Sequence, residues 1–206
     1  MSVVRRKRLT LVRSLVATLM VAGTAGCAVL GGGPPPREIF TLSAPTSFPQ
    51  TIGSSRAQIL VPVPRAVAAL NTDNIAVVSD GTRINYFGGV AWSDRMPRLF
   101  QAKLVEAFEN TGRVRAVGLP GEGLLIDFQL ATDIRAFQLD VNGARKATIE
   151  FSAKIINDRN GRVVATKTIS TQAPAASDSA EDAVAAMNSA LDAALTEVLG
   201  WTLARI

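Results

Sequence analysis

Two Asn-Gly pairs divide the stretch from Leu124 to Ser170 into three runs of alternating apolar and polar residues. A period of two puts the apolar side chains on one face of a β-strand and the polar ones on the other. Asn-Gly favours a two-residue hairpin, because both residues accept a positive φ. The pattern predicts an antiparallel three-stranded meander with one buried face. The inward positions predicted are Ile126, Phe128, Leu130, Ile134 and Ala136 in the first run and Ala147, Ile149, Phe151, Ala153 and Ile155 in the second.

Shorter strands are predicted upstream of the meander. Asp80-Gly81 is a hairpin turn signal between two apolar segments. Pro62 and Pro64 end another segment, which favours a strand that finishes at a sheet edge or leaves the sheet. The segments predicted as strands are Ile39–Leu42, Ala57–Val63, Ile75–Ser79 and Arg83–Phe87.

The apolar period changes to that of a helix in two segments. The first runs from Trp92 to Asn110, with Ser93 or Asp94 as its cap and Thr111-Gly112 at its end. The second runs from about Ser179 to Leu203. Its predicted caps are Ser177, Asp178 or Ser179. The predicted stripes are Met96, Leu99, Phe100, Leu104, Ala107 and Phe108 in the first helix and Val184, Met187, Leu191, Leu195, Val198 and Thr202 in the second.

These elements predict an α+β fold in a single domain. We expect a mainly antiparallel sheet that ends in the three-stranded meander, with two amphipathic helices packed on one of its faces. Trp201, near the end of the second helix, is interpreted as a core residue.

Residues 1–26 have the composition of an export signal. Five Lys and Arg residues and no acid accompany a short apolar run, which ends in small residues before the only cysteine, Cys27. This run is much shorter than the ~20 residues of a membrane-spanning helix. The passage Ala25-Gly26-Cys27 resembles the lipobox of bacterial lipoproteins. The resemblance implies cleavage after Gly26 and diacylglyceryl and N-acyl chains on Cys27, which would hold a domain stably on a membrane.

The segment 27–37 joins three glycines to three prolines, a combination of flexible and stiff spacer sequence. We interpret it as a tether to a periplasmic domain at 38–206. Ala28 follows the cysteine, with no aspartate that would resemble an inner-membrane retention signal. By that resemblance the lipid anchor lies in the outer membrane and the domain faces the periplasm.

The basic excess of the chain is concentrated in the signal. The sequence has 22 Lys and Arg and 17 Asp and Glu, and five of the basic residues but no acid lie in the signal. The mature chain would therefore be balanced. Nucleic-acid binding needs a concentrated positive surface, so it loses its main support.

The sequence contains no histidine, which removes imidazole acid–base catalysis, Ser-His-Asp triads and histidine metal sites. Cys27 is assigned to lipid, so thiol catalysis and an internal disulfide are excluded too. Carboxylate chemistry is left open, because Asp127 and Asp133 are predicted to point from the same face of the meander. We interpret both, together with Asp140, Glu150 and Asp158, as acids on the solvent-exposed face of the meander. We therefore predict no enzyme activity, no metal and no cofactor other than the lipid on Cys27.

Two surfaces are candidates for contact with a partner protein. Tyr86 is the only tyrosine, and Trp92 is predicted to open the first helix. We expect both aromatic side chains to be buried between hairpin and helix, and an exposed partner contact is the alternative. The polar face of the meander, which carries Lys154, is the other candidate surface.

The lipobox, the Gly/Pro tether, the strand ending in proline, the Ile84-x-Tyr86…Trp92 passage, the meander and the Ala-rich last helix together resemble the ABC-type transport auxiliary lipoproteins, a PqiC-like family. The likeness spans about Ile39 to Trp201. It implies a non-catalytic, membrane-anchored periplasmic component of an ABC or MCE-type intermembrane lipid transport system, with transporter proteins as partners. A homo-oligomer would suit a component that surrounds a conduit. The alternative is a structural or assembly lipoprotein that scaffolds another envelope or secretion complex.

Overall fold

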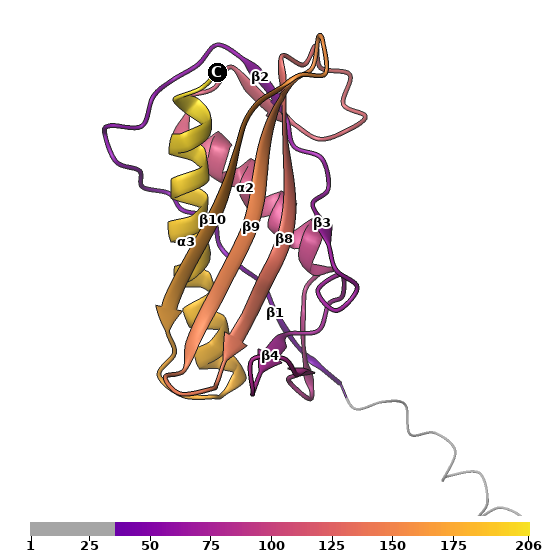
Figure 1. Ribbon diagram of the computed structural model, residues 1–206, viewed down its shortest axis with the longest axis vertical. Helices are drawn as coiled ribbons and strands as arrows, with labels where there is room; N and C mark the ends of the chain where they lie inside the picture. The colour runs from indigo at the N-terminus through magenta and orange to yellow at the C-terminus, as the bar shows by residue number, and fades with distance from the viewer. Residues whose placement is uncertain (1–35) are drawn as a thin grey trace, which may run out of the picture. The chain divides into compact units, whose positions relative to one another are not determined.

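The meander predicted from the alternating runs forms the largest part of the sheet. Its strands are β8 (Phe128–Asp140), β9 (Lys146–Asn157) and β10 (Val163–Pro174), each antiparallel to the next (Figure 1). Gly143 and Gly161 have φ values of 82° and 68°, whereas Asn142 and Asn160 do not adopt positive φ, so each Asn-Gly pair lies in a five-residue connection and not in a two-residue hairpin. The predicted meander is confirmed.

The computed structural model describes residues 36–206, and Arg37–Ile206 form one compact unit. The predicted signal, Cys27 and almost all of the predicted tether lie outside the described residues.

The other edge of β8 pairs with three short strands that follow one another along it, and all three run parallel to β8. They are β2 (Gln58–Leu60), β3 (Arg65–Ala66) and β4 (Ala76–Val78). β5 (Ile84–Tyr86) forms the predicted hairpin with β4, and β7 (Ala116–Gly118) pairs with β2. The predicted strand at 57–63 is therefore shorter than expected and lies between β7 and β8. The parallel pairing was not predicted, because a period of two identifies faces and not partners.

A β-bulge in β8 changes which side chains face the core. Ile134 pairs with Phe151 and Ala136 with Glu150, so Arg135 is an extra residue in the ladder. The buried positions therefore shift from even to odd numbers, and the prediction that Ala136 faces inward in the same alternation was wrong. The buried residues of β8 are Leu130, Thr132, Ile134, Phe137 and Leu139.

Helix α2 (Met96–Thr111) buries the whole predicted stripe. Its start differs from the prediction, because Arg95 is the N-cap residue and no side chain caps the helix. The backbone N–H of Met96 instead donates to the carbonyl of Thr72 at 2.9 Å. The end is as predicted, since Gly112 adopts the left-handed conformation with φ 60°.

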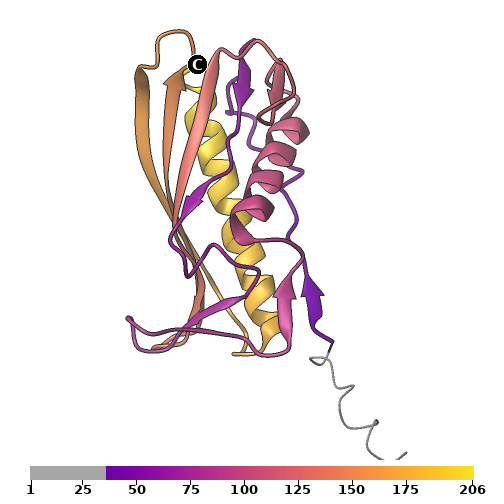
Figure 2. The same cartoon turned by 90° about the vertical axis from the view of Figure 1, so that its right-hand side faces the viewer.

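Helix α3 (Ala180–Leu203) begins after Ser179, whose side chain accepts a hydrogen bond from the N–H of Asp182, so one of the predicted caps is confirmed. α3 packs on β8, β9 and β10, and α2 packs against α3 and β7. Figure 2 shows both helices on the same side of the sheet. Trp201 is buried, as predicted. Neither helix of the described chain has the length and apolarity that crossing a bilayer demands.

The N-terminal strand forms a separate small sheet. β1 (Glu38–Phe40) pairs in parallel with β6 (Val90–Trp92), so Trp92 belongs to a strand and does not open the helix. The α+β class with two helices on one face is confirmed.

Candidate functional site

A groove of about 540 Å³ lies on the face of the sheet opposite the two helices. No helix of the described chain covers this face of the meander (Figure 2). The side chains that give the groove its chemistry are Val63, Arg65, Asp133, Arg135, Lys154 and Ile156.

The groove forms where the chain between β2 and β3 leaves the ladder. β2 is paired with β8 up to Leu60 and Gln129, and pairing resumes at Arg65 and Asp133. Pro62 and Pro64 lie between these points and lack the N–H that a ladder needs. Val61, just before them, uses other partners. Its N–H donates to the carbonyl of Gly118 at 3.0 Å, and its carbonyl accepts from Gln101 Nε2 at 2.8 Å.

The lining of the groove combines positive charge with apolar surface. Three cations, Arg65, Arg135 and Lys154, line it with one acid, Asp133. Arg135 lies 3.6 Å from Glu150, whereas Arg65 and Lys154 form no ion pair within the described part of the chain. Lys154 stands opposite Ala131 in β8 and Thr166 in β10. Neither of these neighbours carries charge, and Asp133, the acid diagonal to Lys154 in the register, forms no ion pair with it, so the Lys154 ammonium is available to an acidic group of a partner.

The structure separates the two aromatic residues that the sequence brings together. Trp92 is only 3% exposed and meets Phe137 edge-on, with ring centroids 6.0 Å apart. Tyr86 is 43% exposed, and its hydroxyl donates to the carbonyl of Ala69 at 3.1 Å. The expected burial is therefore right for Trp92 and wrong for Tyr86. A partner contact at Tyr86 stays a prediction.

The carboxylates considered for catalysis do not form a working pair. Asp127 and Asp133 are six positions apart along extended chain, which separates them by about 20 Å at ~3.3 Å per residue. Asp127 accepts the N–H of Gln58 and the guanidinium of Arg159, each at 3.0 Å. These contacts, the Gln58 bond first, hold the pKa of the Asp127 carboxyl below its usual range. Asp127 therefore acts as a structural anion that ties β2 to the β9–β10 turn.

The other acids of the meander are also held by neighbouring side chains. Asp140 accepts hydrogen bonds from Thr148 and Gln138, and Asp158 accepts one from Gln129. Within residues 36–206, no three His, Cys, Asp or Glu side chains gather as metal ligands would.

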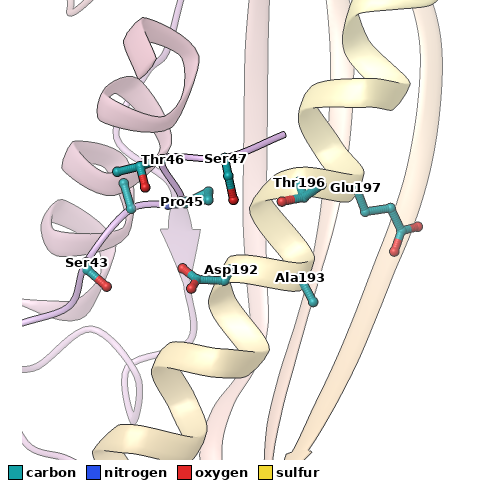
Figure 3. A pocket seen from close by; sticks show the side chains of 9 residues that line it. Ser43, Pro45, Thr46, Ser47, Asp192, Ala193, Thr196 and Glu197 are labelled. Atoms are coloured by element: carbon teal, nitrogen blue, oxygen red, sulfur yellow. The ribbon is translucent and has the colours of Figure 1, made fainter. Parts of the chain in front are cut away.

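A second depression, of about 740 Å³, lies between α3 and the loop at 43–47. Figure 3 shows Asp192 pointing toward this loop, while Glu197 points away from it. Glu197 forms an ion pair with Lys167 at 2.7 Å. Burial raises the pKa of the Asp192 carboxyl, and its Oδ1 has no hydrogen-bond partner among the described residues. The sequence did not indicate this depression, because Asp192 reads as one more polar position of an amphipathic helix.

The sequence and the fold are similar to those of several bacterial proteins. The protein bll6063 of Bradyrhizobium diazoefficiens is 32% identical over 174 residues, which cover 84% of this chain and 47% of bll6063. The chain thus spans about half the length of that relative. The crystal structure of XCC0632 from Xanthomonas campestris has a TM-score of 0.76 at 28% identity, over 81% of this chain and 95% of that one.

More distant likeness concerns the fold alone. The structure of the protein CT253 from Chlamydia trachomatis has a TM-score of 0.51 at 6% identity, over 73% of this chain and 98% of that one. The sequence profile of one family, described as the ABC-type transport auxiliary lipoprotein component, matches residues 40–198. That match includes the groove, both helices up to Val198 and the whole meander. The chain therefore belongs to the ABC-type transport auxiliary lipoprotein family.

Proposed function

We propose that this protein is a membrane-anchored, non-catalytic periplasmic component of an ABC or MCE-type intermembrane lipid transport system. In this role the lipid on Cys27 holds the chain at the outer membrane, and the groove docks a protein of the transporter. The lipobox and the tether sequence support the anchor, and membership of the auxiliary family supports the association with a transporter.

The groove is the observation that carries the docking proposal. It presents two cations without an ion-pair partner in the described chain, Arg65 and Lys154, beside the apolar side chains of Val63 and Ile156. Charged groups of this kind steer encounter and select a complementary partner, while apolar contacts supply binding free energy. We therefore expect the partner to present acidic and apolar side chains together.

Charge reversal at Lys154 tests this proposal, because Lys154 is exposed and its two cross-strand neighbours are uncharged. Lys154→Glu should change the free energy of unfolding by less than about 1 kcal/mol, as surface substitutions usually do. The variant should be lipidated normally but should lose co-purification with the permease, ATPase or MCE protein of the transport system, and should lose lipid transport.

Lys146→Glu is the matched control. Lys146 is in the same strand at a position of the same parity, but it lies outside the groove, about 26 Å away at ~3.3 Å per residue. It stands opposite Asp140 and donates to Gln172 at 3.0 Å, so the free energy of unfolding of this control is measured beside that of Lys154→Glu. It should retain partners and transport. Full function in Lys154→Glu would refute docking at the groove. Recovery of only an unrelated envelope or secretion complex, lost with Lys154→Glu, would favour the scaffolding alternative.

A further inference from the structure

Three arginines line a depression of about 540 Å³ at the end of the unit where α2 stops and β2 and β7 start. The depression is separate from the docking groove. Its lining consists of Ser54, Ser55, Arg56, Gly112, Arg113, Val114 and Arg115. Figure 1 places β2 at one end of the unit and β1, which follows Arg37, at the other.

The positive charge of this depression is not neutralised by the part of the chain that the structure describes. No acid is among the lining residues, and Arg56, Arg113 and Arg115 form no ion pair with any described carboxylate. The charge of Arg115 contributes to lowering the pKa of the Asp127 carboxyl. Asp127 forms its ion pair with Arg159, at 3.0 Å, and not with Arg115.

Local contacts hold one of the three guanidinium groups in place. Arg113 is half-buried, and its Nη1 donates to the carbonyls of Gln50 and Ile52. The N–H of Ser55 donates to the carbonyl of Arg113 at 2.8 Å, which joins the two walls of the depression. A fixed cation loses little conformational entropy when it binds an anion.

The end of helix α2 accounts for Arg113 at most and not for Arg56 and Arg115. A helix C-terminus attracts cations within its last turn, but the last turn of α2 has no basic residue. Arg113 and Arg115 follow the Gly112 cap, and Arg56 belongs to a different segment. Bringing like charges together costs free energy unless an anion compensates them.

We propose that this depression binds a phosphate group. Guanidinium groups match the oxygen atoms of phosphate with paired hydrogen bonds, and the serine hydroxyls of Ser54 and Ser55 can add neutral donors. The group can belong to a phospholipid headgroup or to free phosphate, since both present the same oxyanion. The inference goes beyond the proposed function and uses none of the groove residues, so either can fail while the other stands.

The test is a titration of the full chain, purified in a non-ionic detergent and followed by NMR of its backbone amides. One arm uses inorganic phosphate, and the other uses dihexanoyl phosphatidylglycerol below its micelle concentration. The variant is Arg56→Gln with Arg115→Gln, because both side chains are exposed and the loop contacts of Arg113 stay intact. The control is Arg95→Gln with Arg98→Gln, which removes the same charge from exposed positions at the other end of α2.

We expect saturable shifts at Ser54–Arg56 and Arg113–Arg115 that weaken as salt is raised. The variant should bind at least about tenfold more weakly, as the loss of charged hydrogen bonds predicts, and the control should bind as the wild type does. Lipid binding at least about tenfold tighter than phosphate binding would identify a headgroup, and equal binding would identify free phosphate. No saturable shift with either probe, or equal weakening in the control, would overturn the proposal.

Discussion

Replacing Thr132 by valine should stabilise this protein, although most core substitutions destabilise. Thr132 is 5% exposed and lies in β8 between the inward-facing residues Leu130 and Ile134. Its hydroxyl is buried and has no hydrogen-bond partner among the described residues. Valine has the same branched shape, so the substitution removes the hydroxyl without opening a cavity and keeps a residue that strands favour.

The expected magnitude follows from the cost of an unpaired polar group. Protein mutational data give about 1–3 kcal/mol for a buried hydroxyl without a partner. We use the lower end of this range for Thr132. We therefore expect the free energy of unfolding to rise by about 1 kcal/mol, which corresponds to about 2–4 °C in Tm for a domain of this size.

Urea unfolding of the wild type and two variants measures the effect. Thr171→Val is the matched control, because the hydroxyl of Thr171 donates to the carbonyl of Ala190 at 2.8 Å and joins β10 to α3. The free energy of unfolding of Thr171→Val should fall by about 1 kcal/mol. The two Thr→Val substitutions should therefore change this free energy in opposite directions, while the slope m of the urea transition stays the same. A loss of more than about 0.5 kcal/mol in Thr132→Val would refute the reasoning, since it would show that the hydroxyl is satisfied.

Two further predictions concern carboxylates and the anchor. The pKa of Asp127 is lowered, so Asp127→Asn should destabilise the fold at pH 7, and urea midpoints of variant and wild type should converge as the pH falls through the folded-state pKa. The pKa of Asp192 is raised by burial, so Asp192→Asn should increase the free energy of unfolding at pH 7, and this increase should vanish in acid. An equal increase at pH 3 would contradict the raised pKa. Cys27→Ser should abolish incorporation of radiolabelled fatty acid and release the protein from the membrane, and equal labelling of both forms would disprove lipidation at Cys27.

Local sequence pattern predicted the parts of the fold that depend on nearby residues. The meander followed from alternation and two Asn-Gly turns, and helix α3 followed from its stripe and the Ser179 cap. The bulge at Arg135 could not be predicted from the sequence, because it depends on how β8 pairs with β9. The start of α2 was missed for a similar reason. The N–H of Met96 donates a hydrogen bond to the carbonyl of Thr72. A backbone acceptor from another segment cannot be recognised in the sequence, because every residue carries a carbonyl.

The candidate site was predictable only in part. The alternation correctly placed Lys154 on the open face of the meander. The sequence did not show that this face is hollowed, because the hollow depends on two segments that are distant in the chain. Pro62 and Pro64 correctly indicated the end of a strand. The sequence did not show that pairing with the same edge of β8 resumes at β3, or that the unpaired segment between β2 and β3 lines the groove.

The two walls of the groove differ in how firmly the fold holds them. Lys154 lies in the middle strand of the meander, where β8 and β10 pair with β9 along almost its whole length. Arg65 lies in β3, which has two residues and pairs only with β8 in the described chain. Segments with few backbone hydrogen bonds and little burial open at lower free energy than central strands. A partner that contacts both walls would therefore find its position set by the meander, while the Val63–Arg65 segment can adjust to its shape.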